Sequence, residues 1–325
     1  MMKNIKLKTL FVGVSLVSIC LVLSSCSNND IVTQGSKNEQ NLAASSSSGK
    51  LHEEAVSRTS NKKHEDTALS TEVISNVISN GETDKIKANS KKVIENWEEF
   101  EASDMPLIAA IPEKDIYLYA IKSAKDAQVA LHVGESVHYY NWYYMTPRFI
   151  LPQMQVSDYD KDGKDELSVI LYVGSGTGVS VQELHIVEIP EGKKQSSKQL
   201  DNANPEYYKD YIFDDYCSQL KKAISFKTFI KAGKLMGKIT AGTKTYTVNL
   251  EEFQSEDCGK VNDNIGFGDI VRFDSQKNKL VAEFGFGITC EKFAAPRYIG
   301  AIHADVDYKA GKFKLKNFRF EEDKN

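Results

Sequence analysis

The chain has 325 residues, of which 41% are hydrophobic, 10% aromatic and 26% charged. This composition fits a folded protein and excludes a wholly disordered, collagen-like or multi-span membrane chain. Its 45 acidic residues outnumber 41 basic ones and give a net charge of −4. Nucleic-acid binding needs a concentrated basic excess, so we expect no nucleic-acid partner.

The first 25 residues are organised like a bacterial signal peptide. Three lysines, at positions 3, 6 and 8, precede an uncharged apolar stretch over residues 10–23. As a helix this stretch would rise about 21 Å, which is too short for a hydrocarbon core of about 30 Å. It is therefore expected to be a cleaved targeting segment rather than a permanent membrane span.

The apolar stretch ends in Leu23-Ser24-Ser25-Cys26, which resembles the lipobox of bacterial lipoproteins. The resemblance implies cleavage before Cys26, a diacylglyceryl group on its thiol, palmitate-type acylation and an extracytoplasmic location at the cell membrane. An ordinary secretory signal with a cysteine at this position is the open alternative. Cleavage removes three lysines and no acid, which takes the charge from −4 to −7. Lipid, not surface charge, would then hold the protein at an anionic membrane.

Residues 26–65 are rich in Ser, Asn, Lys and Gln, and they predict a flexible tether because they can bury little apolar surface. Residues 66–104 predict a helical segment. A first helix is expected around Val73–Ile78, with Gly81 as its stop. A second is expected after Asp84, with apolar residues at helical spacing as far as Phe100.

From residue 105 the pattern changes to β-branched and aromatic strands. One helix is expected to interrupt them, with Asn204 as its cap and apolar residues every four positions from Tyr208 to Ile224. Near the C-terminus, residues 302–308 alternate and Ala310-Gly311 predicts a turn, with a bulge near Lys316-Asn317. The predicted fold class is α+β: mainly antiparallel β-sheet with a few helices, as a single globular domain over residues 105–325 behind the tether. The expected strands are 116–120, 129–133, 137–144, 167–173, 181–189, 234–239, 245–250, 270–273 and 280–286.

Residues 158–166 form the one motif with clear chemistry, the pattern D-x-D-x-D-G-x-x-E. Calcium takes six to eight hard oxygen ligands, and alternate carboxylates converge when such a loop curls. Gly163 allows the sharp turn, and position twelve is Val169, so the bidentate glutamate of an EF-hand is missing. The ligands expected for a structural Ca²⁺ are the carboxylates of Asp158, Asp160, Asp162 and Glu166 and the main-chain carbonyl of Lys164.

This loop runs directly into an apolar strand, and it resembles the calcium loop of FG-GAP/VCBS-type domains. Residues 156–189 also resemble a stretch of uncharacterised lipoproteins of Gram-positive bacteria, including its glycine-rich part and following strand. The resemblance implies a metal loop and no known activity. An empty Asp- and Gly-rich surface turn is the open alternative.

Three weaker constellations could belong to a ligand surface. The loop Gly174–Gly178 carries Ser175 and Thr177, either as a hairpin connection or as a nest of backbone amides. The aromatic run at residues 139–144 either packs in the core or forms a platform on which a ligand stacks. Glu183 and His185 share a strand face and could support acid–base chemistry, or the histidine could be structural. The aromatic candidates are Tyr140, Trp142 and Tyr144.

Three cysteines remain beyond Cys26, at positions 217, 258 and 290, and a Cys258–Cys290 disulfide is one open pairing. We therefore expect a non-catalytic, membrane-anchored lipoprotein whose Ca²⁺-braced β-rich domain binds a polysaccharide, a peptide or an envelope protein. One alternative is a cell-wall or carbohydrate-directed hydrolase that uses Glu183 and His185. Another is a solute-binding lipoprotein for a transporter, although the required alternation of helices and strands is missing.

Overall fold

The computed structural model describes residues 92–122, 128–189, 208–293 and 295–323. The expected signal peptide, tether, Cys26 and helix at residues 73–81 lie outside the described residues. Within the described part, no helix has both the length and the apolar character needed to cross a membrane.

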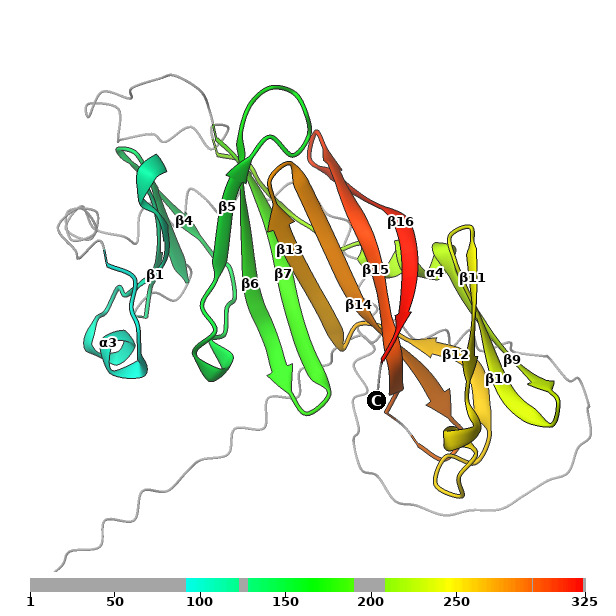
Figure 1. Cartoon of the computed structure of the whole chain (residues 1–325). Coiled ribbons are helices and arrows are strands. Elements are labelled where there is room, and N and C mark those ends of the chain that lie inside the picture. The colour runs from blue at the N-terminus through cyan, green and yellow to red at the C-terminus, as the bar shows by residue number, and fades with distance from the viewer. Residues whose placement is uncertain (1–91, 123–127, 190–207, 294, 324–325) are drawn as a thin grey trace, which may run out of the picture.

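A four-stranded antiparallel sheet, in the order β1-β2-β3-β4, lies at one end of the molecule (Figure 1). Helix α3 (Trp97–Ala102) precedes it, and the side chain of Asn96 caps that helix by accepting from the backbone N–H of Glu99. Two short 3-10 helices follow strands of this sheet, η2 (Pro112–Lys114) and η3 (Pro147–Phe149). The strands are β1 (Leu107–Ile111), β2 (Ile116–Ala120), β3 (Val129–Val133) and β4 (Ser136–Tyr140).

A nine-stranded sheet forms the centre of the molecule, with the order β16-β15-β14-β13-β7-β6-β5 and with β12 on β14 and β8 on β7. All its pairs are antiparallel except β13 with β7. Its strands are β5 (Gln153–Ser157), β6 (Glu166–Gly176), β7 (Val179–Glu188), β8 (Asp210–Ile212), β12 (Val261–Gly266), β13 (Ile270–Gln276), β14 (Lys279–Cys290), β15 (Arg297–Lys309) and β16 (Lys312–Glu322).

A three-stranded antiparallel sheet, in the order β11-β10-β9, lies at the end opposite the four-stranded sheet (Figure 1). Helix α4 (Tyr216–Ala223) leads directly into it, and the 3-10 helix η5 (Glu251–Phe253) follows it. Its strands are β9 (Ile224–Lys231), β10 (Lys234–Ala241) and β11 (Lys244–Asn249).

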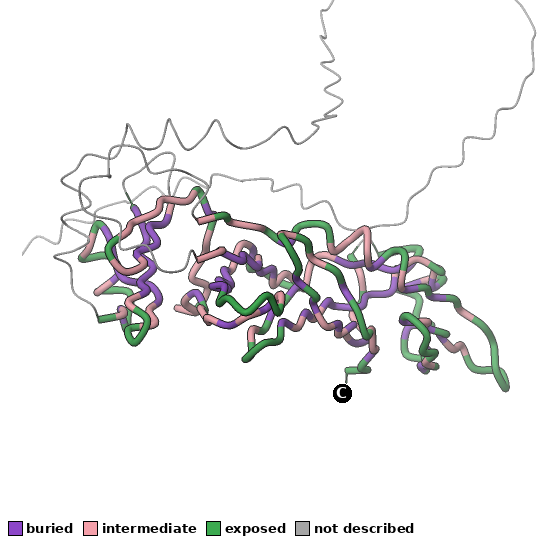
Figure 2. The backbone as a smooth tube through the Cα atoms, turned by 90° about the horizontal axis from the view of Figure 1, so that it is seen from above, coloured by how far each residue is buried: buried purple, intermediate pink, exposed green. Residues whose placement is uncertain are grey.

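The central sheet supplies both major cores, because alternate residues of a strand point to opposite faces. On β6, Leu167, Val169 and Leu171 pack against the four-stranded sheet. On β7, Leu184 and Ile186 face the other core, which includes residues of the three-stranded sheet and α4. Burial on both faces explains why β6 is mostly apolar over residues 167–173, and Figure 2 shows the buried residues running along the interior.

The prediction of a mainly antiparallel β-sheet is confirmed, and β-rich is the better label than α+β. The described residues contain only two α-helices, of six and eight residues. The C-terminal hairpin is also confirmed, including an irregularity where Ala304 faces Asn317 and Phe318. The described Cys258 and Cys290 form a disulfide that joins the segment before β12 to the end of β14.

The helix expected from Tyr208 to Ile224 is wrong over its first half. Residues 210–212 form β8, which pairs with β7 through His185↔Ile212 and its neighbours. The helix is confined to Tyr216–Ala223, and Ile224 begins β9. Apolar residues at every fourth position can also arise from a strand followed by a helix. Here residues 210–212 form a strand because the edge of β7 is available for pairing.

Candidate metal centre and its surroundings

The acidic loop joins β5 to β6 at the end of the central sheet where the β13–β14 and β15–β16 turns also lie (Figure 1). One carboxylate oxygen from each of four predicted ligands lies within 4.8 Å of all the others. The structure therefore brings these four side chains together. They are Asp158, Asp160, Asp162 and Glu166.

Backbone N–H groups of the loop hold the aspartates in place. The N–H of Asp162 donates to Oδ1 of Asp158 at 3.1 Å and to Oδ1 of Asp160 at 2.9 Å. The N–H of Gly163 donates to Oδ2 of Asp158 at 3.1 Å. Lys161 and Gly163 adopt left-handed backbone angles, with φ of 65° and 91°, and these allow the tight curl.

Glu166 closes the cluster from the first position of β6 and is only 1% exposed. Its Oε2 accepts a 2.7 Å hydrogen bond from the backbone N–H of Tyr159. Burial raises the pKa of Glu166 to about 7, and the neighbouring carboxylate of Asp160 acts in the same direction. A bound cation would favour the ionised form of all four carboxylates, so the donor set fits a hard metal ion.

The loop is fastened to its surroundings by contacts with distant segments. Asp165 forms a 2.9 Å ion pair with Lys114, at the end of η2 in the four-stranded sheet. The side chain of Ser157 bonds with Asn278 in the β13–β14 turn. The N–H of Ala310 reaches Oδ2 of Asp160 at 3.5 Å. A cation here would consequently fix the positions of several turns and not only that of its own loop.

The role predicted for Lys164 stays a prediction. Its N–H donates to Oδ1 of Asp162 at 2.8 Å, which gives Lys164 a place in the curl.

A second polar cluster surrounds His185, which is fully buried on β7. Its Nδ1 lies 3.1 Å from Oδ1 of Asp210 on β8, and its Nε2 lies 3.4 Å from Oε2 of Glu183. The indole N–H of Trp142 donates to Oδ2 of Asp210 at 2.6 Å. Burial alone would lower the pKa of His185, but the two carboxylates reverse this and raise it above its ordinary value.

The geometry of this cluster is that of a structural histidine rather than a catalytic one. His185 has no exposed surface through which a substrate could reach its ring. Ser180 lies five residues before His185 on the same strand, which is about 17 Å at 3.4 Å per residue. Ser175 pairs with Ser180 across the hairpin and is equally distant along the strand, and Thr177 lies exposed at its tip.

The aromatic platform expected from Tyr140, Trp142 and Tyr144 does not form as one exposed surface. Trp142 is 3% exposed, and Tyr140 stacks on it with ring centroids 4.3 Å apart. Trp142 also packs against His185, with centroids 4.4 Å apart. Trp142 is buried, and Tyr140 and Tyr144 are both partly buried against the same core, because the four-stranded sheet packs on this face of β6 and β7.

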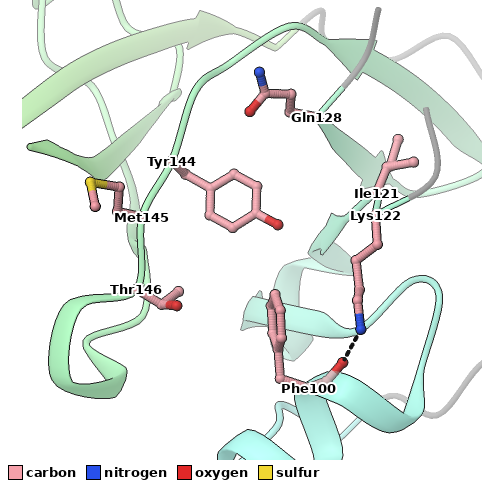
Figure 3. A pocket seen from close by; sticks show the side chains of 7 residues that line it. All are labelled: Phe100, Ile121, Lys122, Gln128, Tyr144, Met145 and Thr146. Carbon is pink, nitrogen blue, oxygen red and sulfur yellow. Dashed lines mark hydrogen bonds between the residues drawn. The ribbon is translucent and has the colours of Figure 1, made fainter. Parts of the chain in front are cut away.

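Tyr144 instead lines a pocket of about 420 Å³ between α3 and the segment after β4 (Figure 3). Its hydroxyl points across the pocket toward the strand end that carries Lys122, and burial raises the pKa of Tyr144 to about 12. Lys122 is held by the carbonyl oxygen of Phe100 at 3.1 Å. The other lining residues are Ile121, Gln128, Met145 and Thr146.

Sequence reasoning missed Asp210 and most of this pocket. Asp210 lies 25 residues beyond His185, in a segment whose spacing indicates a helix. Phe100, Lys122 and Gln128 come from separate elements, and no local pattern links them.

No protein family, no curated protein and no solved structure matches this chain.

Proposed function

We propose that this protein is a non-catalytic, lipid-anchored protein of the extracytoplasmic membrane face. In this proposal a structural Ca²⁺ in the acidic loop braces a β-rich binding domain. The observation that carries the proposal is the convergence of four carboxylates within 4.8 Å in a loop with the D-x-D-x-D-G-x-x-E spacing.

Electrostatics supports a cation in this loop. Carboxylates held this close repel one another in the absence of a counter-charge, and the burial of Glu166 adds a desolvation cost. The donors are all oxygen, which favours Ca²⁺ over softer transition metals. Extracellular Ca²⁺ modules bind with Kd of about 10⁻⁴ to 10⁻³ M, an affinity that suits a loop with so much exposed surface.

The pocket beside Tyr144 supports a binding role. It combines the rings of Phe100 and Tyr144 with the amide of Gln128 and the hydroxyl of Thr146. Aromatic faces beside neutral polar groups suit a sugar unit of a polysaccharide, so we place this ligand ahead of a peptide or an envelope protein.

The metal is tested by thermal unfolding of the full chain in EDTA and in Ca²⁺ at about 10–100 mM, which is 100 times the Kd expected for such a loop. Ca²⁺ at 100 times its Kd should stabilise the wild type by about 2.7 kcal/mol. Asp160→Asn removes one ligand charge and should abolish most of this gain. Asp165→Asn is the matched control, because Asp165 pairs with Lys114 outside the cluster and should keep the gain. Equal Ca²⁺ responses in all three proteins would contradict the proposal.

The anchor is tested by metabolic labelling with a radioactive fatty acid in a Gram-positive host. The wild-type chain should incorporate label and fractionate with membranes, and Cys26→Ala should do neither. Label in the Cys26→Ala chain would contradict acylation at this cysteine.

A further inference from the structure

Positive charge is concentrated in the segment that forms α4 and the three-stranded sheet. Residues 216–250 contain seven lysines and no aspartate or glutamate, although the whole chain has a net charge of −4. Four of these lysines lie on the β9–β10 hairpin and all four are exposed: Lys227, Lys231, Lys234 and Lys238. Two carboxylates contact this hairpin: Glu251 pairs with Lys234 at 2.9 Å, and Asp263 accepts from the backbone N–H of Thr228 at 2.6 Å, beside Lys227. Among the described residues, neither Lys231 nor Lys238 is within ion-pair distance of an acid.

The strand register puts like charges opposite each other. Lys231 faces Lys234 and Lys238 faces Lys227 across the hairpin, and directly opposed lysines destabilise a sheet. Between these two pairs lies an apolar pair, Phe229 and Met236. Along the outer face of the hairpin, toward its tip, a basic pair is therefore followed by an apolar pair and then by a second basic pair.

The end of the hairpin extends past the core that the rest of the sheet covers. Phe226 and Ile239 on the inner face are buried, but Ile230 on the same face is 64% exposed. Ile230 pairs with Leu235, which is half-buried, and Phe229 is 36% exposed. Figure 2 shows the β9–β10 hairpin projecting as an exposed loop, at the opposite end of the molecule from the four-stranded sheet.

We propose that the β9–β10 hairpin docks on an anionic phospholipid surface, with Ile230 and Phe229 entering the headgroup region and the surrounding lysines contacting lipid phosphates. This inference goes beyond the proposed function, because it needs neither the calcium loop nor an acylated Cys26. Each lysine near an anionic membrane strengthens binding about fivefold, and the exposed apolar tip adds the burial that retains the hairpin there.

The apolar tip favours a lipid surface over a soluble polyanion. A soluble polyanion would satisfy the lysines but would leave Ile230 in water, whereas the membrane interface accepts both kinds of side chain. A second copy of this chain is disfavoured because two such hairpins would bring eight lysines together.

The test places a tryptophan at the tip and asks whether lipid quenches it. The full chain with Ile230→Trp is reconstituted into vesicles of brominated phosphatidylcholine, with or without about one third brominated phosphatidylglycerol. The matched control is Tyr143→Trp, because Tyr143 is 46% exposed and belongs to the opposite end of the molecule. Thermal unfolding of each variant is compared with that of the parent chain.

The native Trp97 and Trp142 also emit, so the emission from position 230 is taken as the difference between the variant and the parent chain. In anionic vesicles this difference emission should shift to the blue and fall about twofold, and about 1 M salt should reverse both changes. Adding Lys231→Gln and Lys238→Gln should reduce the apparent affinity for phosphatidylglycerol about 25-fold. The Tyr143→Trp chain should respond no more than the parent.

Three results would overturn the proposal. The first is a chain that fails to sediment with anionic vesicles or shows no quenching at position 230. The second is quenching of equal size at positions 143 and 230, or in vesicles without anionic lipid. The third is the same emission change with soluble polyphosphate, or with rising protein concentration alone, which would indicate a polyanion site or a second copy.

Discussion

The indole N–H of Trp142 donates a 2.6 Å hydrogen bond to Asp210, the carboxylate that also lies 3.1 Å from Nδ1 of His185. Trp142 follows β4, and the other two residues lie on β8 and β7. The three side chains therefore join the four-stranded sheet to the central sheet through polar bonds inside an otherwise apolar interface.

Trp142→Phe should destabilise the fold by about 1–3 kcal/mol, because it removes a donor and leaves Asp210 with one partner fewer. The free energy of unfolding in urea measures this loss. Tyr143→Phe is a suitable control, because Tyr143 is adjacent in sequence but 46% exposed. A loss of similar size in both variants would show that the hydrogen bond does not carry the effect.

Asp210→Asn should lower the pKa of His185, since burial alone lowers it and the carboxylates of Asp210 and Glu183 raise it. A histidine with a raised pKa in the folded state contributes stability fully below its unfolded pKa and loses it as pH rises through the folded value. The difference in stability between the wild type and Asp210→Asn should therefore be largest below about pH 6.5 and should shrink at higher pH. NMR titration of the His185 ring, with urea unfolding between pH 5 and 9, measures both effects. A larger advantage at high pH would contradict the assignment.

His138→Phe should remove part of the acid sensitivity of the protein. Burial lowers the pKa of His138 to about 4, and its ring packs 3.6 Å from that of Tyr208 between centroids. Because the unfolded histidine binds its proton near pH 6.5, the stability of the wild type falls by about 3 kcal/mol as pH drops from 6.5 to 4. Urea unfolding across this window should show a shallower loss for His138→Phe. Parallel curves for the two proteins would contradict the prediction.

Replacing both Cys258 and Cys290 by alanine should cost about 3–4 kcal/mol, because their disulfide spans 32 positions of sequence and restricts the unfolded chain. Both cysteines are buried in the larger core, so alanine also leaves small cavities. Thermal unfolding of the double variant measures the cost. The wild type under reducing conditions separates the two contributions, because reduction opens the bond without removing the sulfur atoms.

The sequence predicts those elements whose conformation is set by residues close together in the chain. Alternation over residues 302–308, followed by Ala310-Gly311, predicts the C-terminal hairpin because turn type and register are set within a few residues. The spacing of Asp158, Asp160 and Asp162 likewise predicts their convergence, since the loop curls on its own backbone.

Elements that depend on distant partners could not be predicted in this way. The segment around Ile212 becomes β8 because β7 offers it an edge, and no nearby residue encodes that pairing. The burial of Trp142 and His185 follows from the packing of one sheet on another. The sequence predicts that Glu183 and His185 share one strand face, but it does not reveal that Asp210 completes their network.

The burial of β6 and β7 on both faces also determines how the protein unfolds. Leu171 belongs to one core and its neighbour Ile170 to the other, so neither core can open without disturbing the same strand. Unfolding should accordingly be cooperative across the whole body, from the four-stranded sheet to the lysine-rich hairpin. Any ligand that holds one end closed would then slow hydrogen exchange at backbone amides of the other end, without touching them.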